Sequence, residues 1–526
     1  MYLEISGIKV SLGQGEETLL NKVASILAIP AESIKSLKVI RRSIDARRRR
    51  PPHFVYTVKV SLSGGIPLTE QTGEGFTTKQ ALEEEIPPFH PAADRLSKRP
   101  VVVGSGPAGL FAALTLANRG VPPLLLERGK RVAERVMDVN RFWKEGRLNP
   151  ESHVHFGEGG AGTFSDGKLT SRAKNPYTDW VKRILVDMGA PSDILTDARP
   201  HIGTDRLRSV VVNLRAKLIE LGCEVRFAAR VTDFLISRDK IIGVIINHQE
   251  EVRTDHLIVA AGQSADDTCR RLWERGVRME AKPFAIGVRV EHPQSLINQL
   301  QYGQWFQSPE LPPADYFLTA KIKEMDRSVY SFCMCPGGQV IGCSAESGGM
   351  LVNGMSSFHR DGVYANSAVV VNIRVDDFNG SEPLNGLAFR RQWEEKAFIQ
   401  GGGHYHAPAQ RLMDFLTDKD SGVIGSTSFL PGVQAASLQR VLPGFVVEAL
   451  KKGFRQFDQK MPGFMTNEAH LIGVETRTSS PVRILRGSDG QSVNVKGLYP
   501  CGEGAGYAGG IISSALDGIR AAQSIP

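Results

Sequence analysis

The 526-residue sequence predicts an α/β protein in which a nucleotide-binding parallel sheet is interrupted by an inserted, β-rich α+β domain. Three observations predict this class. A strand, a glycine-rich turn, a helix and a second strand follow one another from Val101. That rhythm is lost between about Arg275 and Gly463, where strand-like segments with turn signals dominate. It returns at the C-terminal end, and a chain of this length is expected to hold about three or four domains.

The first residues predict a small β-α-β-β module, which we place at residues 1–90. Apolar and polar residues alternate in "YLEISGIKVSL", "SIKSLKVIRRSI" and "HFVYTVKVSL", and the run "EETLLNKVASILAI" has helical spacing. We expect a short helix at "TTKQALEEE". The proline-containing stretch "IPPFHPAADRLSKRP" reads as a linker to the next domain.

The motif "VVVGSGPAGL" predicts a Rossmann-type dinucleotide site. Gly104 allows a tight turn, Gly106 lets the backbone approach a pyrophosphate, and Gly109 lets the helix pack against the strand. Glu127 ends the next strand, where a carboxylate accepts hydrogen bonds from a ribose. The ordinary alternative is a tight turn in an α/β sheet without a nucleotide. At this point NAD and FAD both remain open.

The first part of the binding domain is expected at residues 91–275. The run "DRLRSVVVNLRAKLIELG" predicts an amphipathic helix that feeds the strand "CEVRF". The segments "RVTDFLIS", "KIIGVIIN" and "HLIVAAG" predict a β-meander that returns to the main sheet.

The inserted domain is expected at residues 276–463, and the binding domain resumes at 464–526. Helices are predicted at "FRRQWEEKAFIQ", "PAQRLMDFL" and "GFVVEALKKGFRQF". In "CMCPGG", Cys333 and Cys335 share one face of a strand before a Pro-Gly turn, so we expect a hairpin there, not a metal site.

Three features favour FAD over NAD. A long polar stretch follows "ERG", where an NAD-binding unit would continue to its third strand. The loop "FGEGGAGTFSDGKL" offers backbone N–H groups together with Thr163, Ser165 and Lys168 as donors. The end "YPCGEGAGYAGGIISSALDGIRAA" places Glu503 near a helix that starts at about Gly510, whose positive end suits a reduced flavin. A surface linker and a glycine-rich helix cap are the respective alternatives.

The segments "VVVGSGPAGL…ERG", "LIVAAG" and "GLYPCGEGAGYAGG" resemble those of the glutathione-reductase-like flavoprotein class. Nearly the whole chain is similar to bacterial proteins known as uncharacterised FAD-dependent dehydrogenases. The resemblance implies non-covalent FAD, a Rossmann-type FAD-binding domain with an inserted substrate domain, and no known substrate.

The resemblance also implies roles for individual residues. Gly104 to Ala108 would carry the pyrophosphate, Val231 would contact adenine through its backbone, and Gly502 and Glu503 would lie near the ribityl chain. The full predicted cofactor-binding set is Gly104, Ser105, Gly106, Pro107, Ala108, Gly109, Glu127, Arg128, Gly160, Ala161, Gly162, Thr163, Ser165, Lys168, Val231, Ala261, Gly262, Gly502, Glu503, Gly510 and Ile511.

Catalytic residues are not identifiable from the sequence. Many members of the glutathione-reductase-like class carry a second G-x-G-x-x-G in an NAD(P)H-binding domain, and we find no such domain motif here, so the hydride comes from the substrate, from NAD(P)H bound without that motif, or from a protein donor. The redox disulfide of the resembling class is missing, so we do not expect dithiol chemistry, and Cys501 reads as a small buried hydrophobe. Arg477 has two interpretations, a partner for an anion or a structural ion pair.

Two histidine pairs with i, i+2 spacing, His153 with His155 and His404 with His406, lack a third nearby ligand, so no metal site is predicted. The segment from His404 to His406 is a better candidate for substrate contacts.

Charge and composition define the remaining alternatives. The net charge is +8, and the run "RRSIDARRRR" is strongly basic, so a flavin-containing RNA-binding or RNA-modifying protein is the main alternative function. A flavin sensor without turnover is a third. The absence of C-x-x-C, of a signal peptide and of a membrane span predicts a cytoplasmic protein without a membrane partner. The sequence carries no indication of oligomeric state.

Our interpretation is therefore an FAD-dependent oxidoreductase, dehydrogenase-like, that transfers a hydride between flavin and an unidentified organic small molecule. The inserted domain is expected to hold that substrate. Nucleic acid is not the expected partner.

Overall fold

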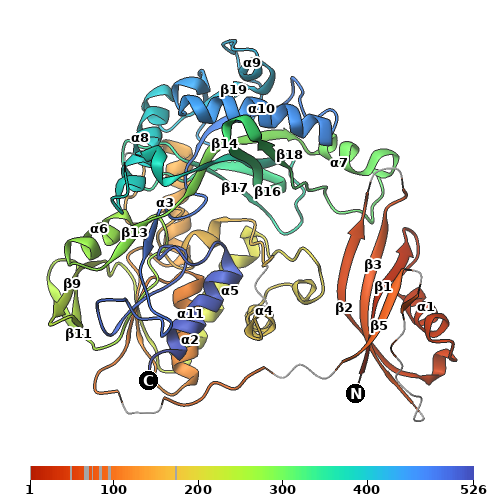
Figure 1. The fold of residues 1–526 in the computed structure, drawn as a ribbon, viewed down its shortest axis with the longest axis horizontal. Coiled ribbons are helices and arrows are strands. Elements are labelled where there is room, and N and C mark those ends of the chain that lie inside the picture. Colours follow the sequence, from red (N-terminus) through yellow and green to blue (C-terminus); the bar gives the residue numbers. More distant parts are fainter. Residues whose placement is uncertain are drawn as a thin grey trace.

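The computed structural model describes residues 2–47, 50–63, 70, 72–73, 75–81, 86–92, 96–171, 175–378 and 380–526. Figure 1 shows an N-terminal module to one side and, beside it, a central parallel sheet with its helices beneath a large, mostly antiparallel sheet. The chain is thus an α/β fold in which the large sheet is inserted into the central unit. No helix in the described ranges combines the length and the apolar character needed to cross a bilayer.

The N-terminal module is a five-stranded sheet with one helix packed on it, in the strand order β2-β3-β1-β5-β4. Leu3, Ile5 and Val58 form part of its own small core. The elements are β1 (Tyr2–Ser11), α1 (Glu17–Leu27), β2 (Ile34–Asp45), β3 (His53–Leu62), β4 (Thr72–Gly73) and β5 (Phe76–Ala81).

The expected helix at "TTKQALEEE" was wrong for the residues that the structure describes. Residues 77–81 lie in β5, which pairs antiparallel with β1. Pairing with the free edge of β1 outweighs a weak helical preference. Leu82 to Glu85 lie outside the described residues.

The module docks onto the rest of the chain through its basic strand. Arg42 donates its backbone N–H to the Thr196 carbonyl oxygen at 2.8 Å, and its guanidinium pairs with Asp197 at 2.9 Å. Arg47 pairs with Asp45 within the module. Arg48 and Arg49 of the same basic run lie outside the described residues. At least part of this charge is therefore used for internal ion pairs.

The central sheet has the parallel order β23-β12-β6-β7-β8, so the last strand of the chain returns beside the strand "LIV". Its middle strands are wholly apolar, as expected for strands covered on both faces. Helices α2 and α11 pack closely, since a Cβ on Gly518 would lie 2.1 Å from the Ala108 carbonyl oxygen. The elements are β6 (Val101–Val103), α2 (Pro107–Asn118), β7 (Leu124–Leu126), α3 (Val132–Glu145), α4 (Tyr177–Asp187), α5 (Thr204–Glu220), β8 (Glu224–Arg226), β12 (Leu257–Val259), α6 (Asp266–Glu274), β23 (Leu498–Pro500) and α11 (Ile511–Gln523).

The predicted meander is confirmed only in part. "RVTDFLIS" and "KIIGVIIN" form β9 (Val231–Ser237) and β10 (Lys240–Ile246) of a separate three-stranded sheet, but the third strand of that sheet is β11 (Glu250–Arg253). "HLIVAAG" instead supplies β12 of the central sheet. A two-stranded ladder of β13 (Met279–Ala281) and β22 (Val482–Ile484) marks the two crossings between the central unit and the large sheet.

The large sheet has eight strands in the order β15-β16-β18-β14-β21-β19-β20, with β17 paired to β16. Along β14, Val288 and Val290 belong to the core under α10, so the intervening Arg289 points to the opposite face. The elements are β14 (Phe284–Pro293), α7 (Gln294–Tyr302), β15 (Thr319–Ile322), β16 (Arg327–Gly342), β17 (Val352–Ser356), β18 (Tyr364–Ile373), α8 (Asn385–Gln400), β19 (Ala407–Arg411), α9 (Leu412–Leu416), β20 (Val433–Ala435), α10 (Gly444–Lys460) and β21 (His470–Glu475). Strand β21 extends this sheet beyond residue 463.

Two expectations within the large sheet were wrong. The first half of "PAQRLMDFL" lies in β19, which pairs with β20 and β21, and only its second half is helical. The "CMCPGG" segment does not turn, because β16 continues to Gly342 with β17 and β18 on its two edges. Two register shifts absorb the extra residues, and Pro336, which lacks an N–H, falls within the second, between Cys335 and Gly338.

Candidate functional site

The first glycine-rich turn joins β6 to α2 without room for side chains. Gly104 has a φ of +100°, and a Cβ there would lie 2.3 Å from the Ala260 carbonyl oxygen. A Cβ on Gly109 would lie 1.8 Å from the Gly104 carbonyl oxygen, so α2 packs directly on the turn. No described side chain caps the helix at Gly106. An uncapped helix N-terminus of this kind suits a phosphate group.

The buried Glu127 carboxylate ties this turn to its neighbours. It accepts hydrogen bonds from Ser105 N (2.9 Å) and Oγ (2.7 Å), from Gly129 N (2.9 Å) and from Gly157 N (3.0 Å). The carboxylate therefore holds three backbone segments at the end of β7. Its role as a ribose contact stays a prediction.

The second glycine-rich segment packs against the first. Gly159 N donates to the Ser105 carbonyl oxygen at 3.0 Å, and a Cβ on Gly160 would lie 3.0 Å from Gly106 Cα. Phe156, Phe164 and Leu169 are buried at its edges and anchor it. The segment is thus part of the packed structure and not a surface linker.

A buried arginine that the sequence analysis did not select shapes this segment. Arg135 of α3 donates to the carbonyl oxygens of His153 (2.8 Å), Glu158 (2.6 Å), Val154 (2.8 Å) and Gly160 (2.9 Å). Burial lowers the pKa of Arg135 to about 9. One side chain therefore fixes the path of the whole loop.

The C-terminal segment supplies a third side of the site. Asp517 of α11 accepts from Gly502 N at 2.7 Å and pairs with Arg486 at 2.5 Å, which holds the turn after β23. Glu503 accepts from Gln263 Nε2 at 2.8 Å, and burial raises the pKa of Glu503 to about 7. Gly510 precedes α11 with a φ of +130°, and no described atom would contact a Cβ there.

These segments enclose a cavity of about 370 Å³ between the central sheet and the large sheet. It runs from the neighbourhood of Val231 past the start of α2 to residues of β16 and β21. Its lining is Val103, Gly104, Ser105, Gly106, Pro107, Ala108, Leu126, Glu127, Arg128, His155, Phe156, Gly160, Ala161, Gly162, Ser165, Asp166, Gly167, Lys168, Thr170, Ala229, Arg230, Val231, Ala260, Ala261, Gly262, Gln263, Ser264, Thr268, Phe332, Cys333, Asn353, Glu475, Arg477, Thr478, Gly502, Glu503, Gly509, Gly510, Ile511 and Ser514.

Every residue of the predicted cofactor-binding set except Gly109 and Thr163 lines this cavity. Gly109 serves the packing of α2 on its own turn. The Thr163 hydroxyl donates to the Glu158 carbonyl oxygen at 2.9 Å within the loop, and its role as a donor to the cofactor stays a prediction. The predicted residues that line the cavity come from six separate stretches of the chain.

At the Val231 end, charged side chains form a ring that the sequence did not reveal. Arg128 pairs with Glu151 and with Asp267, both at 2.9 Å, and stacks over the Phe156 ring at 4.0 Å. Arg230 pairs with the same two carboxylates at 3.0 and 2.6 Å. The ring holds the meander, α6 and the second loop together.

The large sheet contributes a wall of paired side chains. Arg289 donates to Glu475 (2.6 Å), to Asn353 Oδ1 (2.6 Å) and to the Cys333 carbonyl oxygen (2.9 Å). Burial raises the pKa of Glu475 to about 7. Arg477 pairs with the buried Glu394 at 2.9 Å, which favours the structural ion pair of its two interpretations.

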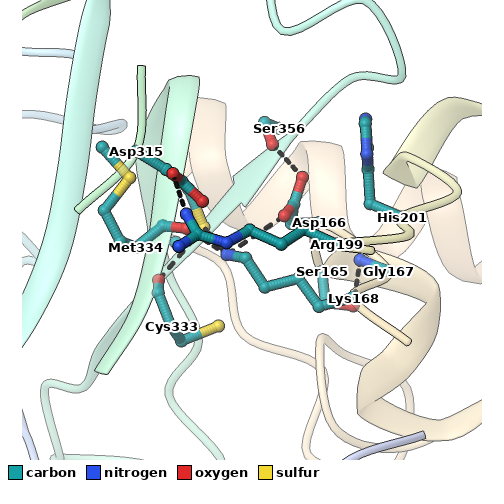
Figure 2. Close-up of polar contacts among 12 residues, drawn as sticks. Ser165, Asp166, Gly167, Lys168, Arg199, His201, Asp315, Cys333, Met334 and Ser356 are labelled. Atoms are coloured by element: carbon teal, nitrogen blue, oxygen red, sulfur yellow. Dashed lines mark hydrogen bonds and ion pairs between the residues drawn. The ribbon is translucent and has the colours of Figure 1, made fainter. Parts of the chain in front are cut away.

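Lys168 spans the two walls. Figure 2 shows it reaching from the second loop toward Met334 of β16, whose carbonyl oxygen accepts from its ammonium group. The ammonium also pairs with Asp166 at 3.0 Å and lies 3.9 Å from Cys335 Sγ. Burial alone would lower the pKa of Lys168, but the Cys335 and Cys333 thiols and Asp166 outweigh it and raise that pKa.

Other predicted candidates lie differently. His155 lines the cavity and His153 is buried beside it, and burial lowers both pKa values, that of His155 to about 3. Tyr405, between His404 and His406, packs on Phe142 and Phe398. None of these three residues lines the cavity, and their expected substrate contacts stay a prediction. Cys501 is fully buried. Over the described ranges, no three His, Cys, Asp or Glu side chains are grouped to hold a metal ion.

Comparison with known proteins adds the family. Residues 283–478 match the model described as FAD-dependent protein, C-terminal domain-like, and residues 102–161 match an NAD(P)-binding Rossmann-like domain. Residues 2–61 match a domain of unknown function. An uncharacterized protein of Clostridium beijerinckii is 44% identical over 527 aligned positions that span 100% of this chain and 98% of that protein. The chain belongs to this family of FAD-dependent proteins.

Other known proteins are similar to only a part of this chain, or align with it at low sequence identity. A digeranylgeranylglycerophospholipid reductase of Methanococcoides burtonii is 30% identical over 28% of this chain and 33% of its own length. The structure of the flavin-dependent brominase Bmp2 aligns over 81% of this chain and 77% of its own, at 15% identity and a TM-score of 0.35. A geranylgeranyl bacteriochlorophyll reductase-like protein of Thermoplasma acidophilum aligns over 81% and 77%, at 13% identity and a TM-score of 0.34.

Proposed function

We propose that the protein is an FAD-dependent oxidoreductase, dehydrogenase-like, that transfers a hydride between an organic small molecule and flavin in the bacterial cytoplasm. The observation that carries the proposal is the shared cavity. Residues 104–108, 160–162, 165–168, 502–503 and 509–511, from three regions far apart in sequence, line it together. A long, jointed cofactor would explain why three such segments meet. Membership of the glutathione-reductase-like class is part of the proposal.

The polar atoms of the cavity support the fit of FAD. Gln263 Oε1, Ser264 Oγ, His155 Nε2 and Arg477 Nη1 are buried and have no hydrogen-bond partner among the described residues. All four belong to residues that line the cavity. Because buried polar groups normally find partners, such a cluster is typical of a site that holds a polar ligand.

Each part of the chain would then have a definite task. The N-terminus of α2 binds the pyrophosphate, with the backbone of Gly104 to Ala108 close to it. Glu127 accepts from the adenosine ribose, and Val231 lies beside the adenine. Glu503 accepts from the ribityl chain. FAD, when bound, supplies the ring that accepts or gives the hydride.

The walls would set the electrostatics of the reaction. The N-terminus of α11 after Gly510 faces the cavity and carries partial positive charge, which stabilises an anionic reduced ring. The large sheet excludes water from that end and leaves Lys168, Cys333 and Asn353 facing it. We assign the substrate to this side, since the opposite end is taken up by the nucleotide segments.

NAD(P)H remains a proposed electron donor beside direct reduction by the substrate. The RNA-binding alternative gains no support from the comparisons, and Arg42 of the basic strand is engaged with Asp197. We therefore keep the oxidoreductase as the single proposed function.

The test is to purify the protein and measure its flavin. The proposal predicts a yellow protein that releases FAD on denaturation. Anaerobic bleaching by NADH, NADPH or one member of a metabolite panel would then name the donor. A colourless preparation that also fails to take up added FAD would contradict the proposal.

A further inference from the structure

Cys333 occupies an unusual backbone position in the cavity wall. The pairing of β16 with β18 shifts register between Phe332 and Cys335, which leaves one extra residue in β16. Cys333 lies at this bulge with a φ of +47°, a conformation that costs a non-glycine residue about 1–2 kcal/mol. Its side chain lines the cavity, whereas Cys335 is fully buried behind it.

The bulge is held rigidly from both sides. The Cys333 carbonyl oxygen accepts from Arg289 Nη1 at 2.9 Å and from the Cys335 thiol at 3.3 Å. The next carbonyl, that of Met334, accepts from Lys168. Three donors thus fix a segment of only three residues. Glycine would be the ordinary residue at such an angle, so the cysteine side chain is retained despite its backbone cost.

The two thiols are placed for a bond between them. Residues i and i+2 of a strand share a face, and their Cα atoms are roughly 6.5 Å apart in a regular strand, at the upper end of the range for a disulfide. The bulge turns Cys335 Sγ back to within 3.3 Å of the Cys333 carbonyl oxygen. The Cys335 side chain is therefore directed back toward the Cys333 backbone, on the stretch of β16 that lines the cavity.

The surroundings favour a thiolate at Cys333. A hydrogen bond from Cys335, together with Lys168 and Arg289, holds the pKa of the Cys333 thiol well below its usual value. The hydrogen bond to Cys333 and burial raise the pKa of Cys335. Cys333 and Glu503 line the same cavity. One acidic and one weakly acidic thiol resemble the division of labour in dithiol oxidoreductases.

We propose that Cys333 and Cys335 form a redox-active dithiol–disulfide pair that exchanges two electrons with the bound flavin, with thiols or disulfides as the substrate class. This deepens the proposed function and rests on it for the flavin. It departs from the sequence-based expectation of no dithiol chemistry, because the pair lies in the inserted sheet.

The step balances without a further reactant. The Cys335 S–H bond breaks and an S–S bond forms between the Cys333 thiolate and Cys335. Bound oxidised FAD would take up the two electrons and the Cys335 proton. In the opposite direction, the disulfide would take two electrons and a proton from the reduced cofactor, which would restore the Cys335 thiol and leave the Cys333 thiolate free to attack a disulfide substrate.

The pair itself can be tested apart from flavin turnover. The full-length protein is oxidised mildly, alkylated under denaturing conditions and digested with trypsin without reductant. The peptide between Arg327 and Arg360 also contains Cys343, so fragmentation spectra must locate the bond. We expect a Cys333–Cys335 disulfide, which reductant opens, in wild type and in the matched control Cys343→Ser. Two free thiols at 333 and 335 after oxidation would overturn the proposal even if the protein is yellow.

Electron counting tests the exchange with flavin. Anaerobic dithionite titration of the oxidised holoprotein is expected to consume four electrons per chain in wild type and in Cys343→Ser, and two in Cys335→Ser. Two electrons in all three would overturn the exchange but leave the proposed flavoenzyme intact. A protein without FAD would instead contradict the proposed function. Peptide mapping would still show whether the Cys333–Cys335 disulfide forms.

Lys168→Met gives a separate readout on the thiolate. Losing the ammonium raises the pKa of Cys333, and each pKa unit lowers the thiolate fraction about tenfold at a pH below that pKa. We expect the pH profile of iodoacetamide labelling at Cys333 to move to higher pH in this variant, so that labelling below the wild-type pKa slows about tenfold for each unit of the rise, with an unchanged profile in Lys182→Met on α4. Equal profiles in wild type and Lys168→Met would overturn the role of Lys168. If Cys335→Ser fails to fold, blocking the reduced wild-type pair with N-ethylmaleimide gives the same two-electron test.

Discussion

The two walls of the cavity are built on different principles. The wall of the central unit is made of backbone: Gly104, Gly109 and Gly160 allow turns and helices to touch where any side chain would collide. The wall of the large sheet is made of charged side chains that pair with one another, with Arg289 and Glu475 at its centre. We therefore expect added side-chain atoms to disrupt the packing of the first wall, and the loss of a charged partner to destabilise the second.

This contrast also assigns tasks. The backbone wall suits a constant ligand, because N–H groups and helix ends recognise phosphates and riboses in a fixed geometry. The side-chain wall suits the substrate, which differs from enzyme to enzyme, because its side chains set the local charge, the proton affinities and the shape that the substrate must fit. Substitutions on the two walls should therefore separate FAD binding from reaction chemistry.

The largest effect is expected at Arg135, which supports the backbone wall from below. Arg135→Met leaves four carbonyl oxygens of the second loop without their donor, and we expect a loss of about 3–5 kcal/mol with loss of bound FAD. Urea unfolding and flavin content measure both. Arg141→Met, on an exposed position of the same helix, is the matched control. Full FAD content in Arg135→Met would contradict this account of the loop.

A smaller loss is expected from one added methyl group at Gly109. The Cβ would lie 1.8 Å from the Gly104 carbonyl oxygen, so Gly109→Ala should displace α2 at a cost of about 3 kcal/mol and release FAD. Gly444→Ala, at the first position of α10 with no described atom within 4 Å of its Cβ, should fold normally. The check is thermal unfolding with flavin fluorescence. Equal behaviour of the two variants would remove the steric argument.

On the other wall, Arg289→Met should destabilise the protein while FAD stays bound. Glu475 and the Cys333 carbonyl oxygen lose their donor, at a cost of about 2–3 kcal/mol. Because the nucleotide segments are untouched, flavin content should match wild type while the rate of flavin reduction falls. A folded Arg289→Met variant without bound FAD would contradict the separation of FAD binding on one wall from reaction chemistry on the other.

The sequence predicted the backbone wall better than the side-chain wall. The backbone wall was readable because glycines at fixed spacing between a strand and a helix have a physical meaning in the sequence itself. Arg135 was not selected, although it lies in the buried stripe of α3 with Val132, Val139 and Phe142, and a charge in that stripe was the available signal. Arg289 between Val288 and Val290 in β14 gave a similar signal.

Elements whose form depends on a partner were missed. Residues 77–81 became strand because β1 offered a free edge, and the Pro-Gly pair after Cys335 did not turn because β17 and β18 hold β16 straight. Neither partner is apparent from the local sequence. Strands β9 and β10, by contrast, were predicted from alternation and a turn that lie within a single stretch of chain.

A pH measurement can sharpen the account of Glu503. Its pKa of about 7 in the folded protein exceeds the ordinary 4.5, so its contribution to stability is fully present below about pH 4.5 and is lost as pH rises through about 7. In FAD-free protein, Glu503→Gln should lose less stability than wild type between pH 5 and pH 8. Denaturant midpoints across that range give the slopes, and Glu468→Gln on the surface is the control. Identical slopes for wild type and Glu503→Gln would contradict the raised pKa.

The smallest effect is expected at Thr163. Its hydroxyl donates to the Glu158 carbonyl oxygen and does not line the cavity, so Thr163→Val should cost about 1 kcal/mol and leave FAD affinity unchanged. Thr163→Ser retains the donor and should be close to wild type. Weaker FAD binding in Thr163→Val at unchanged stability would instead support the prediction of a direct cofactor contact.

The central claim is that one FAD joins the two walls, and a crystal structure of the FAD complex tests it most directly. We predict the pyrophosphate at the N-terminus of α2, beside Gly104 to Ala108. The flavin ring is predicted between the start of α11 and the wall that carries Lys168 and Cys333. An FAD bound outside this cavity, or with its ring turned away from Cys333, would contradict the account.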